Sequence, residues 1–161
     1  MRHNKIFLAV LAMMALITTA GTFTVNPLIL VSGPSPFGSC SIGGPGTSYV
    51  NAEVEPWVAV NPTNPQNIIG VFQQDRWSNG GSHGLVTSVS HNGGKTWTST
   101  WAHFSFCSGG TVANGGDFDR ASDPWVSFAP NGEAYQISLS VSADQRTSAI
   151  LVSKSTDGGN T

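Results

Sequence analysis

A seven-residue turn motif occurs twice in the chain. It reads Ser-x-Asx-x-Gly-x-Thr and begins at Ser90 and again at Ser155, 65 residues later. A short side chain that accepts backbone hydrogen bonds, followed by a glycine that can take positive φ, is typical of a tight turn. Two copies at this spacing predict a repeated structural unit. The motif residues are Ser90, Asn92, Gly94, Thr96 and the following Trp97 in the first copy, and Ser155, Asp157, Gly159 and Thr161 in the second.

A second pattern repeats upstream of each motif. An acidic residue precedes Pro-Trp-Val at Glu55 and again at Asp123, and a proline ends each of these short apolar runs. Short alternating segments bounded by turn residues predict strands. The predicted strands lie at about 53–61, 67–74, 84–90 and 96–103 in the first unit and at 123–130, 134–141 and 148–154 in the second.

The composition favours an all-β fold. Only 10% of the residues are charged, glycine occurs 19 times, and no convincing amphipathic helix is found. A unit of about 65 residues with four short antiparallel strands has the size of a β-propeller blade, and rings need four to eight blades. We therefore expect the chain to be the N-terminal fragment of a longer propeller and to cover about one and a half to two blades. The alternative is a small sandwich that is complete at residue 161.

The N-terminus has the pattern of a signal peptide. A short basic region, 1–5, precedes an apolar run, 6–20, so residues 1–20 are predicted to be removed on secretion. The alternative is an uncleaved anchor, which would be the protein's only membrane contact. Residues 21–52 are rich in Pro, Gly and Ser and are read as an extended lead-in without a core of its own. Removing the first 20 residues moves the net charge from −2 to −4, and no basic cluster suggests nucleic acid.

The chain contains two cysteines, Cys40 and Cys107, both beyond the predicted signal peptide. In the oxidising environment of a secreted or cell-surface protein they would be able to form a disulfide. Such a bond would tie the lead-in to the connection between the two units. Two free thiols are the alternative, because the sequence does not give the distance between the cysteines.

The repeated turn motif resembles the Asp box of the bacterial-neuraminidase-repeat proteins, the sialidase-like propeller superfamily. The resemblance covers about residues 53–161 and implies a six-bladed ring, with a first blade at about 53–110 and part of a second at about 118–161. In this family the box forms the turn between the third and fourth strands of a blade, away from the substrate face. The box residues are therefore expected to stabilise the fold.

The resemblance also suggests where a ligand would bind. Sialidases grip a carboxylate with three arginines and use an aspartic acid as acid/base, with a tyrosine nucleophile. Here Glu55 stands in place of the first arginine, and the loop 77–84 has no carboxylate in place of the aspartic acid. Gln74-Asp75-Arg76 resembles the polar end of the family's second strand, which makes Asp75 the candidate acid/base. The candidate ligand-binding residues, expected to converge on one face, are Arg76, Asp119, Arg120, Asp123 and Glu55.

No cofactor motif is indicated, and no metal site is expected: the spacing of Asp117, Asp119 and Asp123 suggests calcium, but the glycine and the terminal glutamate of an EF-hand loop are missing. His83 and His91 have no sequence partner that suggests catalysis, and Trp57 and Trp125 are expected in the core. The leading hypothesis is a secreted propeller that binds glycans or other extracellular polymers. Whether it also hydrolyses them is left open by the sequence. The two alternatives are an active exo-sialidase and a non-catalytic structural or protein-interaction propeller. The sequence leaves the oligomeric state open.

Overall fold

The structure, a computed structural model, describes residues 25–161, which form an all-β fold. The predicted signal peptide lies outside the described residues. The strands form one seven-stranded antiparallel sheet in the order β1-β2-β3-β5-β6-β7, with β4 paired to β3. None of the helices in the described part is long and apolar enough to cross a membrane. The elements are β1 (Ser48–Val60), β2 (Ile68–Trp77), β3 (Ser82–Ser90), β4 (Thr98–Thr100), two 3₁₀ turns η1 (Phe106–Ser108) and η2 (Val112–Asn114), β5 (Arg120–Phe128), β6 (Ala134–Val141) and β7 (Ser148–Ser155).

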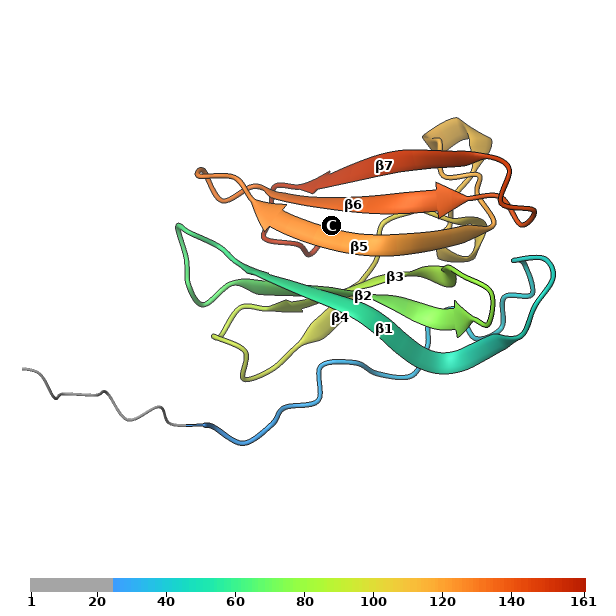
Figure 1. The fold of residues 1–161 in the computed structure, drawn as a ribbon. Coiled ribbons are helices and arrows are strands. Elements are labelled where there is room, and N and C mark those ends of the chain that lie inside the picture. The colour runs from blue at the N-terminus through green and yellow to red at the C-terminus, as the bar shows by residue number, and fades with distance from the viewer. Residues whose placement is uncertain (1–24) are drawn as a thin grey trace, which may run out of the picture.

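The sheet divides into two layers at the connection between β3 and β5. These two strands share one backbone pair, Ser82 with Ala121, whereas the other neighbours pair over several residues. Strands β1–β4 therefore form one layer and β5–β7 a second layer, which face each other in Figure 1. The all-β class predicted from the sequence is confirmed, and the arrangement as propeller blades stays a prediction.

Most strands lie close to their predicted positions, with two differences. Strand β1 begins at Ser48, earlier than expected, and continues through two irregularities in its pairing with β2. Strand β4 is only three residues long, because the chain turns away after Thr100 toward η1, which contains Cys107.

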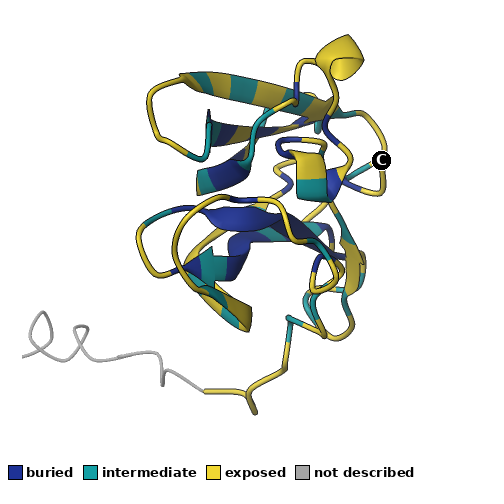
Figure 2. Cartoon of the chain, turned by 90° about the vertical axis from the view of Figure 1, so that its right-hand side faces the viewer, coloured by how far each residue is buried: buried dark blue, intermediate teal, exposed yellow. Residues whose placement is uncertain are grey.

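The core between the layers is small and apolar. Ile69, Val71 and Val89 of the first layer pack with Val126 and Ala134 of the second, and all five are almost fully buried. Figure 2 shows the buried residues concentrated in the middle of the molecule, with exposed positions on the outer strands. The two layers are therefore held together mainly by removal of these side chains from water.

The repeat in the sequence is also a repeat in the structure. Glu55 and Asp123, the acidic residues before Pro-Trp-Val, have left-handed φ values of 56° and 53°. Each lies where the pairing of its strand with the next is shifted, which is the geometry of a β-bulge. The tryptophans that follow, Trp57 and Trp125, stack on each other with ring centroids 3.7 Å apart. Equivalent positions of the two units thus meet where β1 lies beside β5.

The lead-in packs against the face of the first layer that points away from β5–β7 (Figure 1). Phe37 is buried there in a cluster with Phe72 and Val86. The disulfide between Cys40 and Cys107 that the sequence predicts is present, with the two Cα atoms 5.7 Å apart. The extended segment therefore contributes a side chain to the core of the first layer and is fixed to it covalently.

Each turn motif is closed by the same set of hydrogen bonds. In the first copy the Ser90 hydroxyl accepts from the amide of Gly94 at 2.8 Å, and Asn92 Oδ1 accepts from the amide of Thr96 at 2.9 Å. In the second copy the Ser155 hydroxyl accepts from the amide of Gly159 at 2.8 Å, and Asp157 Oδ1 from the amide of Thr161 at 3.1 Å. The motif is a self-contained turn in both places.

The second turn motif also contacts the first layer. Asn67 donates a hydrogen bond to the carbonyl of Gly158 at 3.0 Å, and His91 Nε2 lies 3.1 Å from Asn160 Oδ1. A Cβ atom at Gly159, whose φ is +98°, would lie 2.7 Å from the Cδ1 atom of Ile69. Glycine is therefore required here both for its backbone conformation and for the close approach of the layers.

We predict that Gly159→Ala destabilises the protein more than Gly115→Ala. Both glycines have positive φ, but a Cβ at Gly115 meets nothing within 4 Å, so this control measures the backbone strain alone. The additional overlap with Ile69 is expected to lower the free energy of unfolding by a further ~1–3 kcal/mol. Urea unfolding of the two variants measures the difference, and equal losses would contradict the close contact between the layers.

A second prediction concerns Asp157. Hydrogen bonds from the Thr161 and Ser155 hydroxyls and from the Thr161 amide hold the pKa of Asp157 well below its ordinary value. A lowered pKa in the folded state stabilises the protein above the unfolded pKa of about 4, and this stabilisation is lost as the pH falls further. We expect the stability advantage of the wild type over Asp157→Asn to shrink as the pH is lowered from neutral to about 3.

The first motif supplies the matched control, because Asn92 occupies the position of Asp157 and does not titrate. Asn92→Asp is expected to gain the same acid-sensitive stabilisation, since the amides and the hydroxyl around it have the same arrangement. Thermal unfolding of the three proteins over the same pH range tests both expectations. Parallel curves for wild type and Asp157→Asn would rule out the role of the lowered pKa.

Candidate functional site

The sequence-predicted site residues fall into two separate environments. Asp75, Arg76, Arg120 and Asp119 lie around the β2–β3 turn and the lead-in, whereas Glu55 and Asp123 lie where β1 meets β5. The six residues therefore do not form a single cluster. We call the second environment the β1–β5 seam, which consists of Glu55, Trp57, Gln73, Ser122, Asp123 and Trp125.

The candidate acid/base, Asp75, is fully buried and has four hydrogen-bond partners. Its Oδ2 accepts from the hydroxyl of Ser35 at 2.5 Å and lies 3.2 Å from His83 Nδ1. Its Oδ1 accepts from the amide of Asn51 at 2.8 Å and from the side chain of Gln74 at 3.3 Å. These contacts join the lead-in, β1, β2 and β3 at one carboxylate. In this arrangement Asp75 organises the fold, and a substrate would reach it only after the lead-in moved.

His83 is the contact of Asp75 that sequence reasoning left out. It has no partner nearby in the sequence, but the β2–β3 hairpin pairs Gln74 with Gly84 and Arg76 with Ser82, so positions 75 and 83 lie directly opposite. Ser78–Gly81 form the connecting turn, and a hairpin register counted outward from it would have placed the two side chains on the same face. The pairing of Asp75 with His83 could therefore have been predicted from the strand register of the hairpin, although no sequence motif indicates it.

Arg120 is also fully buried, and its guanidinium is occupied by protein acceptors. It donates to the carbonyls of Gly43, Gly80 and Pro45 at 2.6–2.7 Å and to Asn79 Oδ1 at 2.8 Å. It also lies over the ring of Trp77, with its Cζ atom 4.5 Å from the ring centroid. Burial lowers the pKa of Arg120 below its ordinary value, while Asp119 raises the pKa and Arg76 lowers it. The planar fork thus clamps the lead-in onto the β2–β3 turn.

Arg76 and Asp119 also have partners within the chain. Arg76 donates to the carbonyl of Gly81 at 2.9 Å, and Asp119 Oδ2 accepts from the amide of Ala143 at 2.7 Å. Each stabilises a turn next to its own strand. Arg120 is therefore not presented as an unoccupied binding group for a carboxylate, whereas Arg76 uses one donor on Gly81 and is partly exposed.

The polar groups of the β1–β5 seam lie closer to solvent. Glu55 and Asp123 are exposed, and Glu55 Oε2 accepts from the backbone amide of Asp123 at 3.3 Å. Gln73, which is fully buried between them, donates to Glu55 and to the hydroxyl of Ser122, the latter at 3.0 Å. Ser122 in turn donates to Asp123 Oδ1 at 2.6 Å. One connected network therefore links the two acidic bulges through a buried amide.

The tryptophans beside this network are not core residues, contrary to the expectation from the sequence. Trp57 is 40% exposed and Trp125 is 49% exposed, although their rings stack and Trp57 Nε1 donates to the carbonyl of Val126 at 3.1 Å. The bulges at Glu55 and Asp123 displace the strands so that the two rings meet each other at the surface. Two partly exposed indoles thus lie next to two exposed carboxylates.

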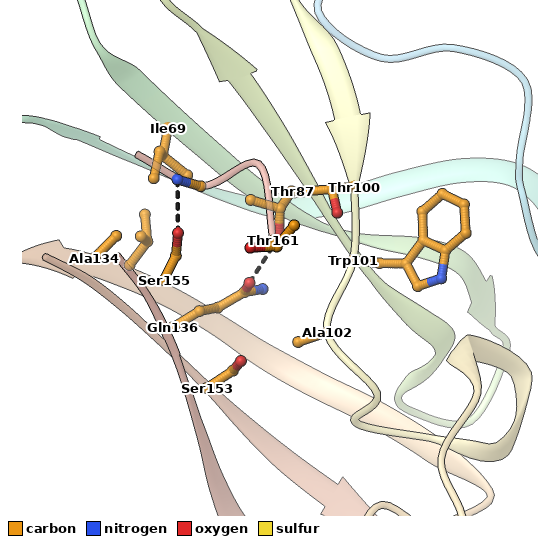
Figure 3. A pocket seen from close by; sticks show the side chains of 12 residues that line it. Ile69, Thr87, Thr100, Trp101, Ala102, Ala134, Gln136, Ser153, Ser155 and Thr161 are labelled. Carbon is orange, nitrogen blue, oxygen red and sulfur yellow. Dashed lines mark hydrogen bonds between the residues drawn. The ribbon is translucent and has the colours of Figure 1, made fainter. Parts of the chain in front are cut away.

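A small pocket between the layers is a third place where polar groups gather (Figure 3). Thr87 donates to Gln136 Oε1 at 2.7 Å, and the buried amide nitrogen of Gln136 has no partner among residues 25–161. The pocket has a volume of about 70 Å³, which is room for about two water molecules. It is therefore suited to ordered water and is too small for a sugar residue.

Within residues 25–161, no group of three or more His, Cys, Asp or Glu side chains is arranged to hold a metal ion. Comparison of the chain with known protein families, with curated proteins and with solved structures finds no match.

We predict that Arg120→Lys lowers the free energy of unfolding by about 2–4 kcal/mol, because a lysine ammonium cannot reach four acceptors spread around a planar fork. Arg146→Lys is the matched control, since Arg146 is exposed and lies 3.8 Å from Asp144 in a surface ion pair. Its effect should stay within about 0.5 kcal/mol. Urea unfolding measures both, and a stable Arg120→Lys protein would show that the clamp is dispensable.

Proposed function

We propose that the protein is an exported β-propeller of the sialidase-like kind that binds glycans, and that the β1–β5 seam is part of its binding surface. Strands β1–β4 would be one blade and β5–β7 the first three strands of the next. The disulfide between Cys40 and Cys107 is consistent with an oxidising, extracellular location.

The internal repeat supports the blade arrangement. Both units place an acidic bulge before Pro-Trp-Val on their first strand and close a turn motif of the same bonding pattern after their third. First strands of neighbouring blades lie side by side around the axis of a propeller. The stacking of Trp57 on Trp125 is the contact expected of two such strands.

The outer face of the second layer supports a continuing ring. Ile69, Val71 and Val89 on the first layer are covered by the second layer. The corresponding face of β6 and β7 carries Ile137 and Val152, which are 37% and 62% exposed. An apolar sheet face of this kind is normally covered by another layer. A further blade would cover it as β5–β7 cover β1–β4.

The observation that carries the binding proposal is the pair of exposed, stacked indoles beside the carboxylates of Glu55 and Asp123. Aromatic rings offer a flat apolar surface, and carboxylates accept hydrogen bonds from hydroxyl groups. A sugar has an apolar ring face and a rim of hydroxyl donors, so this combination suits it. In the proposed ring the first strands line the central channel, where such a ligand would bind.

Binding is favoured over sialidase-type hydrolysis by the surroundings of the candidate catalytic residues. Asp75 is buried under the lead-in, and the guanidinium of Arg120 is occupied by four acceptors. Among residues 25–161 the candidate acid/base is inaccessible, and Arg76, which is partly exposed and donates one hydrogen bond, is the remaining candidate for gripping a carboxylate. Catalysis would need groups that these residues do not supply.

Trp125→Ala tests the binding proposal, because Trp125 is the more exposed ring of the pair. Screening the protein on a glycan array and titrating its strongest ligand should show about tenfold weaker binding for this variant, from loss of the stacking surface. Trp101→Ala is the matched control, since Trp101 is 39% exposed and lies outside the seam. Absence of any glycan ligand, or equal binding by the two variants, would refute the proposed function.

A further inference from the structure

The β1–β5 seam carries negative charge that the protein does not neutralise. Glu55 and Asp123 are exposed, and Glu53 lies nearby on β1, where its carboxylate accepts from Gln74. Within the described part of the chain, the salt bridges are His83–Asp75, Arg146–Asp144 and Lys154–Glu133. None of them includes a carboxylate of the seam. A ligand bound here would therefore meet an acidic surface.

The hydrogen-bonding capacity that remains in the seam consists of acceptors. Gln73 is fully buried with its amide nitrogen against Glu55 and Ser122, yet its Oε1 atom has no partner among the described residues. Because this oxygen has almost no accessible surface, the acceptors that a ligand in the seam can reach are the carboxylates. Each of the two carboxylates also has one oxygen that accepts no hydrogen bond from the described residues. In Glu55 this is Oε1, since Oε2 has the partners, and in Asp123 it is Oδ2, since Oδ1 has the partner.

The arginines do not reverse this chemistry. Arg120 is held by backbone carbonyls and by Asn79, and Arg76 donates to Gly81. A ligand with a carboxylate would thus face the carboxylates of Glu55 and Asp123 without a compensating cation in the seam. A ligand with an ammonium group would find two carboxylates, and the neighbouring indole rings would attract it further through their π faces.

We infer that the seam recognises a polymer of amino sugars with free amines. This inference rests on the proposed glycan binding and specifies its ligand: the sugar rings lie against the exposed parts of Trp57 and Trp125, and the ammonium groups donate hydrogen bonds to Glu55 and Asp123. Acidic glycans, including sialylated ones, are excluded by the charge of the seam.

The test is calorimetric titration with four probes on the full protein. The probes are an oligomer of glucosamine, the fully N-acetylated oligomer of the same length, a sialylated oligosaccharide, and an oligolysine of matched charge, at a pH where the glucosamine amines are protonated. We expect the glucosamine oligomer to bind at least about tenfold more tightly than each of the others, and added salt to weaken its binding.

Variants then locate the interaction. The double variant Glu55→Gln, Asp123→Asn keeps the side-chain shapes and should weaken glucosamine binding about tenfold, without changing the binding of the acetylated oligomer. Glu133→Gln is the matched control, because it removes an acidic charge that lies outside the seam and pairs with Lys154. It should leave all four affinities unchanged.

The outcomes separate this inference from the proposed function. Tight binding of the acetylated or the sialylated oligomer in preference to the glucosamine oligomer would overturn the inference while glycan binding stood. Equal binding of oligolysine and the glucosamine oligomer would show recognition of charge alone and would also overturn it. If no sugar probe bound and the glycan array were blank, both proposals would fail.

Discussion

The contact between β1 and β5 is the interaction on which the described structure depends. The two layers share only one backbone pair between β3 and β5, so the sheet's hydrogen bonds alone do not fix their relative position. Their position is set by the stacked Trp57 and Trp125, by the bond from Trp57 Nε1 to the Val126 carbonyl, and by the apolar core behind them. Because the two tryptophans occupy equivalent places, a sequence repeat becomes a contact between repeats.

The bulges give the same contact its chemistry. In a regular strand the side chains of Glu55 and Trp57, which are two residues apart, would point to the same face of the sheet. Left-handed backbone at Glu55 and Asp123 adds a residue to each strand and turns both acids toward the Gln73–Ser122 network. Such conformations cost about 1–3 kcal/mol each and cluster at functional sites. Their occurrence at equivalent acids of both units is consistent with a role in binding.

The sequence predicted the strands well because local signals determine them. The turn motif, the Pro-Trp-Val pattern and hydrophobic alternation are all short-range, and they located the ends of β6 and β7 closely. The disulfide was predicted from two cysteines beyond a signal-peptide pattern, with free thiols as the alternative, and the structure decides between them because it brings the two Cα atoms to 5.7 Å. The early start of β1 was missed because its bulges interrupt the alternation on which the prediction relied.

The environments of the candidate residues could not be read in the same way, because they depend on contacts distant in sequence. Asp75 meets Ser35 of the lead-in, and Arg120 meets Gly43 and Pro45, which lie in a segment whose composition predicts an extended lead-in without a core of its own. A segment rich in Pro and Gly presents many unpaired carbonyls, and these are the groups that a buried guanidinium requires.

The roles of these charged residues bear on the sialidase-like architecture that we propose. The charged residues that most resemble that family, Asp75 and Arg76, are committed to contacts with the lead-in and the β2–β3 turn, while Glu55, the residue that departs from it, lies in the open seam. A seam with an acid in place of an arginine reverses the sign of the charge that a ligand meets. The proposed propeller would therefore keep the sialidase-like fold but carry a binding surface of the opposite charge. We expect its ligand to be positively charged, unlike sialic acid.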